Sequence, residues 1–103
     1  MVAQPESGIV TKIVKELRAR GVYVVKLHGH AMQISGLPDL ICCFRGRYIG
    51  LEVKTARGLP TELQLHTLDE IRAAGGVAAV VRSVAEVITI FERMELTHVP
   101  AAT

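Results

Sequence analysis

The stretch LPDLICCFRGRYIGLEVK, residues 37–54, predicts the β-hairpin around which the rest of the fold is arranged. Its apolar and β-branched residues predict strands over 40–44 and 48–54, and Arg45-Gly46 between them predicts a compact turn. Pro38 disfavours helix at the preceding residue and is tolerated where a strand begins. We therefore expect a β-hairpin whose first arm starts at or directly after Asp39.

Helices and strands alternate around this hairpin. Apolar residues at helical spacing predict a helix over 6–20 that Gly21 ends, and capping-box spacing at Thr61–Gln64 and at Ser83–Glu86 predicts two further helix starts. The remaining elements are a strand over 22–27, a polar loop over 28–37, the close of the middle helix at Gly75-Gly76, a strand over 77–81 and a last helix to about Met94. The order α-β-β-β-α-β-α, with a parallel crossover between 48 and 81, indicates an α/β fold with a mixed sheet flanked by helices.

Length and composition limit the possible classes of protein. The chain has 103 residues, half of them apolar, which predicts a single domain over 1–103 with one core. No apolar run is long enough to span a membrane, and no secretion signal is visible. The adjacent Cys42 and Cys43 suit neither a disulfide nor a metal clip, so we expect reduced apolar side chains and a cytoplasmic protein.

Charge is distributed unevenly along the chain. Residues 1–58 hold nine Lys and Arg against four Asp and Glu, whereas residues 59–103 hold three against six. Two Phe, two Tyr and no Trp leave few rings on which single-stranded bases could stack. This pattern favours a partner contacted through its phosphates, and nothing in it indicates a membrane or a nucleotide cofactor.

Two carboxylates of the hairpin suggest a metal site. Glu52 and Lys54 leave the same face of their strand, and Asp39 begins the neighbouring arm, about 5 Å away. These carboxylates, with the Val53 carbonyl, suit Mg²⁺ or Mn²⁺, and Lys54 could orient a water or neutralise charge in a transition state. Glu-x-Lys on a strand is also a common solvated pair. The prediction therefore depends on the combination of Pro38-Asp39, a hairpin-length gap, and Glu52 and Lys54 inside an otherwise apolar strand.

Two further residues have alternative roles. Glu6 precedes the apolar stripe of the first helix, so it is either another metal ligand or an acid placed favourably at a helix N-terminus. Gln64 either completes the helix cap with Thr61 or reaches the site through its amide. Both alternatives stay open at the level of sequence.

These residues resemble the PD-(D/E)xK nuclease superfamily and, more narrowly, its virus-type replication-repair (VRR-NUC) family. The resemblance extends over about residues 6–92, through Glu6, SGLPDLI (35–41), GLEVK (50–54) and GLPTELQ (58–64). It implies a metal-dependent endonuclease with Asp39 and Glu52 as metal ligands, Lys54 as the catalytic lysine, Glu6 as the helix acid and Gln64 as the glutamine of the following helix. A stand-alone domain of this size resembles the phage-encoded members, which implies a homodimer that acts on branched DNA such as four-way (Holliday) junctions, in viral replication, recombination or repair.

Other surfaces have alternative interpretations. The residues considered for contact with DNA are Lys12, His28, Gln33, Ser35 and Arg57, each of which could equally lie on an ordinary solvated surface. A zinc pair of His28 and His30 lacks further ligands. The residues considered for a dimer interface are Ile88, Ile90, Phe91 and Met94, and packing on the sheet is their favoured alternative. Rival functions are a flap or single-strand nuclease and a catalytically silent DNA-binding module.

Overall fold

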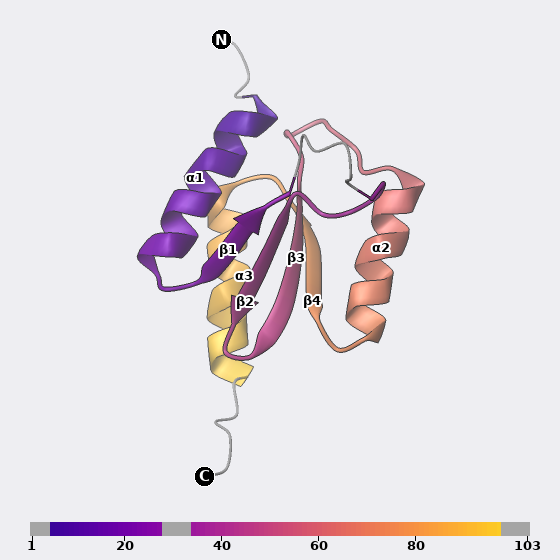
Figure 1. Ribbon diagram of the computed structural model, residues 1–103. Helices are drawn as coiled ribbons and strands as arrows, with labels where there is room; N and C mark the ends of the chain where they lie inside the picture. The colour runs from indigo at the N-terminus through magenta and orange to yellow at the C-terminus, as the bar shows by residue number, and fades with distance from the viewer. Residues whose placement is uncertain (1–4, 28–33, 98–103) are drawn as a thin grey trace.

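A computed structural model describes residues 5–27 and 34–97. Its elements, in chain order, are α1 (Glu6–Ala19), β1 (Tyr23–Lys26), β2 (Leu40–Phe44), β3 (Arg47–Val53), α2 (Glu62–Ala73), β4 (Val77–Val81) and α3 (Val84–Thr97) (Figure 1). The predicted order α-β-β-β-α-β-α is confirmed. Boundaries differ by a few residues: β1 and β3 end before Leu27 and Lys54, and α3 continues past Met94.

The strands form one mixed sheet in the order β1-β2-β3-β4. Both neighbours of β2 are antiparallel to it, and β4 is parallel to β3, as the crossover through α2 requires. Arg45 and Gly46 have φ of 54° and 75°, the left-handed pair that matches the twist of a two-residue hairpin. Leu40 pairs with Leu51, so Asp39 and Glu52 lie together at the open end of the hairpin.

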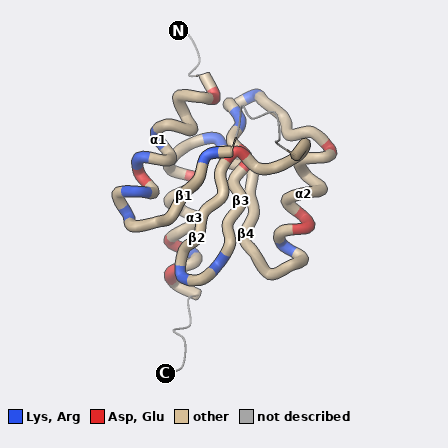
Figure 2. The backbone as a smooth tube through the Cα atoms, in the orientation of Figure 1, with Lys and Arg blue, Asp and Glu red and all other residues tan. Residues whose placement is uncertain are grey.

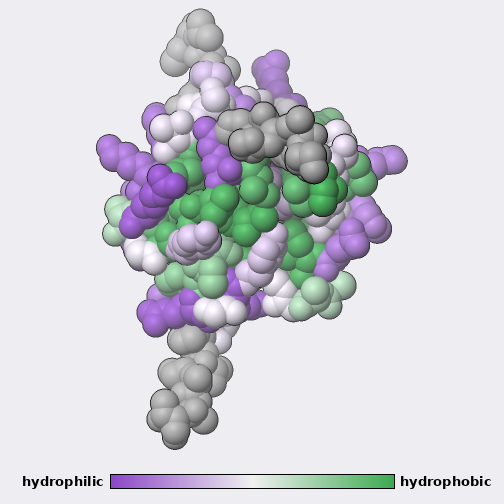
Figure 3. Space-filling model, in the orientation of Figure 1, coloured by the Kyte–Doolittle hydropathy of each residue, from purple (hydrophilic) through white to green (hydrophobic). Residues whose placement is uncertain are grey.

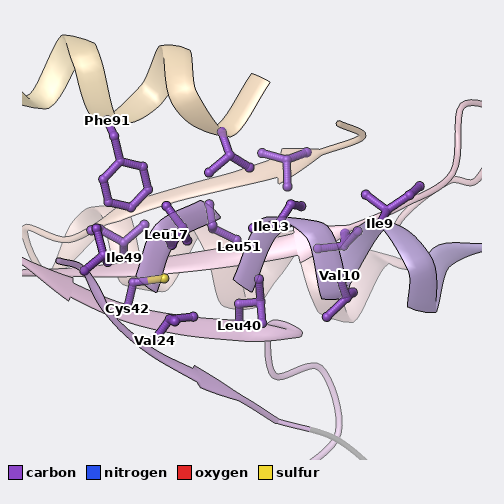
Figure 4. Packing of buried hydrophobic residues seen from close by; sticks show 14 of the residues in the cluster. Ile9, Val10, Ile13, Leu17, Val24, Leu40, Cys42, Ile49, Leu51 and Phe91 are labelled. Carbon is purple, nitrogen blue, oxygen red and sulfur yellow. The ribbon is translucent and has the colours of Figure 1, made fainter. Parts of the chain in front are cut away.

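The main core lies between one face of the sheet and the helices α1 and α3. The helices contribute Ile9, Val10, Ile13, Leu17, Val87, Phe91 and Met94, and the sheet contributes residues that include Val24, Leu40, Cys42, Ile49 and Leu51 (Figure 4). Phe91 packs edge-on against Phe44, with ring centroids 5.3 Å apart. Burial of Phe91 and Met94, with Ile90 packed against them, confirms that these residues of α3 belong to the core.

Helix α2 covers the opposite face of the sheet, over β3 and β4 (Figure 1). Gly50 makes this close approach possible, because a Cβ there would lie 2.7 Å from Ile71 Cδ1 and 3.0 Å from Pro38 Cγ. Helix α2 therefore approaches β3 closely at Gly50, which lies two residues before Glu52.

The outer face of β1 and β2 is not covered by a described helix. Tyr23 is 67% exposed, Tyr48 is 42% exposed, and Cys43 is exposed beside them. Figure 3 shows hydrophobic residues gathered over this part of the sheet and beside α2. The two cysteines therefore differ: Cys42 is core as expected, whereas Cys43 is not, because successive residues of a strand face opposite sides.

No helix in the described part of the chain is long and apolar enough to cross a membrane.

Candidate metal and phosphodiester site

The open end of the hairpin holds the two predicted carboxylates. The Val53 backbone N–H donates to Asp39 Oδ2 over 2.7 Å, which ties the start of β2 to the end of β3. Asp39 is partly exposed, whereas the Glu52 side chain is only 1% exposed. The carboxylates of Asp39 and Glu52 are therefore neighbours with different access to solvent.

Glu52 uses its two oxygens differently. Oε2 accepts a hydrogen bond from Gln64 Nε2 over 2.9 Å and lies 3.7 Å from Lys54 Nζ. Oε1 is buried and accepts no hydrogen bond from the described residues. A buried carboxylate oxygen without a partner is costly, and a bound cation would satisfy it. The donor set of Asp39 and Glu52 therefore fits a hard divalent cation.

The electrostatics agree with this interpretation. Burial, followed by the charge of Asp39, raises the pKa of the Glu52 carboxyl to about 8, and Lys54 opposes the shift. The charge of Glu6 also raises the pKa of Glu52, by a smaller amount, so the Glu6 carboxylate lies close enough to interact with Glu52. A positive charge placed among these groups would return the Glu52 carboxyl to its ionised form.

Gln64 performs both of the roles that the sequence left open. Thr61 Oγ1 accepts from the Gln64 backbone N–H over 3.1 Å, and Gln64 Oε1 accepts from the Thr61 backbone N–H over 2.8 Å, which completes the capping box of α2. With Oε1 occupied in this way, the amide nitrogen points to Glu52. The cap therefore fixes which end of the amide faces the site.

Glu6 lies at the edge of the site. It lines a cavity of about 210 Å³ together with Ser7, Val10, Lys26 and Asp39. Within residues 5–27 and 34–97, no group of three or more His, Cys, Asp and Glu side chains is arranged to hold a metal ion. Asp39 and Glu52 are thus a pair of carboxylates, with Glu6 across the neighbouring cavity, and metal ligation by Glu6 and by the Val53 carbonyl remains a prediction.

A basic groove adjoins this cavity. We give this name to Lys15, Arg18 and Lys26, which line a second cavity, of about 450 Å³, with Thr11 and Val14. Figure 2 shows basic positions along α1 and at the end of β1, close to acidic positions at the same end of the sheet. Lys26 lines both cavities and thereby connects the basic groove to Asp39.

The three residues of the basic groove are not among those predicted from the sequence to contact DNA. Lys15 and Arg18 stand three apart on a helix, but only the tertiary packing of α1 against β1 adds Lys26. Three of the residues predicted from the sequence to contact DNA are exposed, namely Lys12, Ser35 and Arg57. His28 and Gln33, and also His30 of the considered zinc pair, lie outside the described residues.

Comparison with known proteins adds structural relatives. Neither a family model nor a curated protein matches the chain. A solved VRR_NUC domain is 29% identical, with a TM-score of 0.70 over 84% of this chain and 94% of that chain. A solved VRR_NUC domain protein is 18% identical, with a TM-score of 0.72 over 90% and 89%. Hjc of Archaeoglobus fulgidus, a Holliday junction resolvase from an archaeal hyperthermophile, is 20% identical, with a TM-score of 0.58 over 75% and 67%.

The fold is therefore of the restriction-endonuclease-like class, with the Asp39 and Glu52 carboxylates at the open end of its hairpin. Within this class the chain is similar to VRR-NUC domains, which confirms the resemblance carried by the motifs at 35–41, 50–54 and 58–64.

Proposed function

We propose that this protein is a Mg²⁺- or Mn²⁺-dependent endodeoxyribonuclease that hydrolyses phosphodiester bonds in branched DNA, such as four-way junctions. The observation that carries the proposal is the buried Glu52 Oε1, which accepts no hydrogen bond from any described residue. Asp39 lies beside this carboxylate, and the other oxygen, Oε2, lies 3.7 Å from Lys54 Nζ. Structural similarity to an archaeal Holliday junction resolvase supports the choice of branched DNA.

Asp39 and Glu52 would hold the divalent ion, with Glu6 and the Val53 carbonyl as further oxygen donors. When bound, such an ion supplies Lewis-acid polarisation of a phosphoryl oxygen and lowers the pKa of a water. Lys54 holds its positive charge beside the carboxylates, where it can stabilise negative charge that develops on the scissile phosphate. Gln64 keeps Glu52 Oε2 occupied, so that Oε1 is the oxygen that remains available.

The basic groove supplies a path for the DNA backbone. Within the described residues, Lys15, Arg18 and Lys26 form no ion pair with a carboxylate, whereas Arg20 pairs with Glu16 and Arg45 with Glu95. Cations without a carboxylate partner are free to pair with phosphates and release counterions. Because Lys26 adjoins Asp39, a strand in the basic groove would approach the carboxylates directly.

A second copy of the chain would complete the proposed enzyme as a homodimer. A domain of this size offers limited surface to hold a junction, and a two-fold pair presents two sites to two strands. The surface that we propose for pairing is the outer face of β1, β2 and the start of β3, with Tyr23, Cys43 and Tyr48, because Phe91 and Met94 of α3 are buried in the core. Sedimentation of Tyr23→Glu beside the wild type tests it; a wild-type monomer at micromolar concentration, with and without DNA, would refute the dimer.

Cleavage of matched four-way junction, flap, linear duplex and single-stranded DNAs, with Mg²⁺ or Mn²⁺, tests the activity. We expect paired, symmetric nicks in the junction, and no cleavage with EDTA or with Lys54→Ala. Preferential cleavage of flap or single-stranded DNA would support the alternative structure-specific nuclease. Binding without cleavage under every condition would indicate a silent DNA-binding module and refute the enzyme.

A further inference from the structure

Arg82 reaches from the end of β4 to the turn that follows β3. Its Nη1 donates to the carbonyl oxygens of Thr55 and Gly58, in each case over 2.6 Å. Its side chain forms no ion pair with a carboxylate in the described part of the chain, and its backbone N–H donates to Glu86. The charged end of Arg82 is therefore committed to two backbone carbonyls, where charge-assisted hydrogen bonds are strong.

The clamped turn folds back on Lys54. The Gly58 N–H donates to the Thr55 carbonyl over 3.1 Å, which closes the turn. The turn begins directly after Lys54, and a Cβ built at Gly58 would lie 3.5 Å from Lys54 Cβ, so the turn folds back close to the lysine. Lys54 itself donates its backbone N–H to the Val81 carbonyl over 3.0 Å, directly before Arg82. Lys54 is thus held to β4 through its backbone, and the clamped turn begins at the next residue, Thr55.

The same turn carries the exposed, positively charged side chain of Arg57. Arg57 lies between the two clamped carbonyls and is exposed, whereas Lys54 at the base of the turn is only 15% exposed. One guanidinium therefore binds the turn that begins directly after Lys54 and carries the exposed Arg57.

We propose that Arg82 is a positioning residue of the nuclease site: it clamps the Thr55–Gly58 turn and thereby fixes Lys54 beside Glu52 and presents Arg57 to the DNA backbone. The proposal rests on the proposed function. Lysine cannot reproduce this clamp in full, because its ammonium is a compact charge on a flexible stem, whereas the guanidinium is a rigid planar fork.

Three variants test the clamp. Arg82→Met removes the hydrogen bonds, and Arg82→Lys keeps the charge. The matched control is Arg72→Met, because Arg72 donates from Nε and Nη2 to the Ala78 carbonyl over 3.1 and 2.9 Å, at the other end of β4. The measurements are the single-turnover cleavage rate at saturating Mg²⁺, the affinity for a four-way junction in EDTA, and the melting temperature.

We expect Arg82→Met to lower the single-turnover rate about 10- to 100-fold, the scale on which a small misplacement of a catalytic group acts. Arg82→Lys should recover only part of this loss, and Arg72→Met should leave the rate near that of the wild type even where it lowers the melting temperature. Wild-type behaviour of Arg82→Lys would show that charge alone matters, and equal rates in Arg82→Met and Arg72→Met would show a merely structural role. Either result overturns the proposal.

A double-mutant cycle tests the route through Arg57. If Arg82 acts through the turn, Arg82→Met weakens junction binding in EDTA in the wild-type background but adds little in the Arg57→Ala background. Additive losses would mean that Arg82 contacts DNA independently, which contradicts the clamp. This cycle needs no cleavage, so an inactive wild-type protein would refute the proposed function while leaving the clamp open to this test.

Discussion

Gln64 on α2 donates a hydrogen bond from Nε2 to Glu52 Oε2 on β3 over 2.9 Å. The amide oxygen of the same side chain caps the helix by accepting the Thr61 N–H. A helix cap and a candidate metal ligand are therefore joined through one side chain, and the two roles can be separated by substitution.

Gln64→Glu should keep the helix cap but remove the hydrogen bond from residue 64 to Glu52. A carboxylate can still accept the Thr61 N–H, but it cannot donate to Glu52 and adds a like charge beside it. We expect a cleavage rate lowered about 10- to 100-fold, as for a misplaced catalytic group, measured in single-turnover cleavage of a four-way junction. Thr61→Ala is the converse control: it should cost about 1 kcal/mol of stability through the lost cap. A wild-type cleavage rate in Gln64→Glu would contradict the role assigned to its amide.

Asp39→Asn should abolish cleavage while the fold remains. The amide oxygen can replace Oδ2 as acceptor of the Val53 N–H, but the site loses a charged ligand. Asp39→Ala removes the acceptor as well, and leaving this N–H without its partner should cost about 1–3 kcal/mol in the free energy of unfolding. Denaturant unfolding and junction cleavage distinguish the two variants. Cleavage by Asp39→Asn at the wild-type rate would remove Asp39 from the site.

The stability of the metal-free protein should fall as pH rises. Burial raises the pKa of Glu52 to about 8 from an ordinary 4.5, so between these values the folded state keeps a proton that the unfolded state releases. The free energy of unfolding in EDTA therefore decreases through this window and levels off above it. Saturating Mg²⁺ should reduce the decrease, because the ion binds the ionised carboxylate. Glu52→Gln, which cannot titrate, should show a flatter profile; an equal decrease in this variant would contradict the assignment.

Neutralising the basic groove should make DNA binding less dependent on salt. Each of Lys15→Gln, Arg18→Gln and Lys26→Gln should lower the slope of log affinity against log salt by about one, for one lost phosphate contact. The control is Arg45→Gln, since Arg45 pairs with Glu95 over 3.0 Å. Fluorescence anisotropy in EDTA with a labelled four-way junction measures the slopes. An equal change in the control would mean that only net charge matters.

The two cysteines should differ in reactivity. Cys42 is buried, and burial raises the pKa of its thiol to about 12, whereas Cys43 is exposed. A thiol reagent should therefore modify one cysteine in the folded protein and both in denaturant, because the thiolate is the reactive form. Cys43→Ser should remove the fast reaction, and fast modification of Cys42 in the folded protein would contradict its burial.

The order of the elements, the hairpin and the parallel crossover could all be predicted from the sequence. These features depend on local signals, such as the turn at Arg45-Gly46 and the cap at Thr61, which act within a few residues. Strand alternation also placed Glu52 and Lys54 on one face. The resemblance to VRR-NUC domains followed from the same residues.

The assembly of the site, in contrast, depends on tertiary packing and could not be predicted from the sequence. Burial of Glu52, its bond to Gln64 12 residues away, and the clamp from Arg82 to carbonyls 27 and 24 residues away depend on how α2 and β4 pack against β3. The meeting of Lys26 with Asp39 depends likewise on the pairing of β1 with β2. Such contacts leave no periodic signal in the chain, because each joins residues whose separation is set by the fold and not by the repeat of a helix or strand.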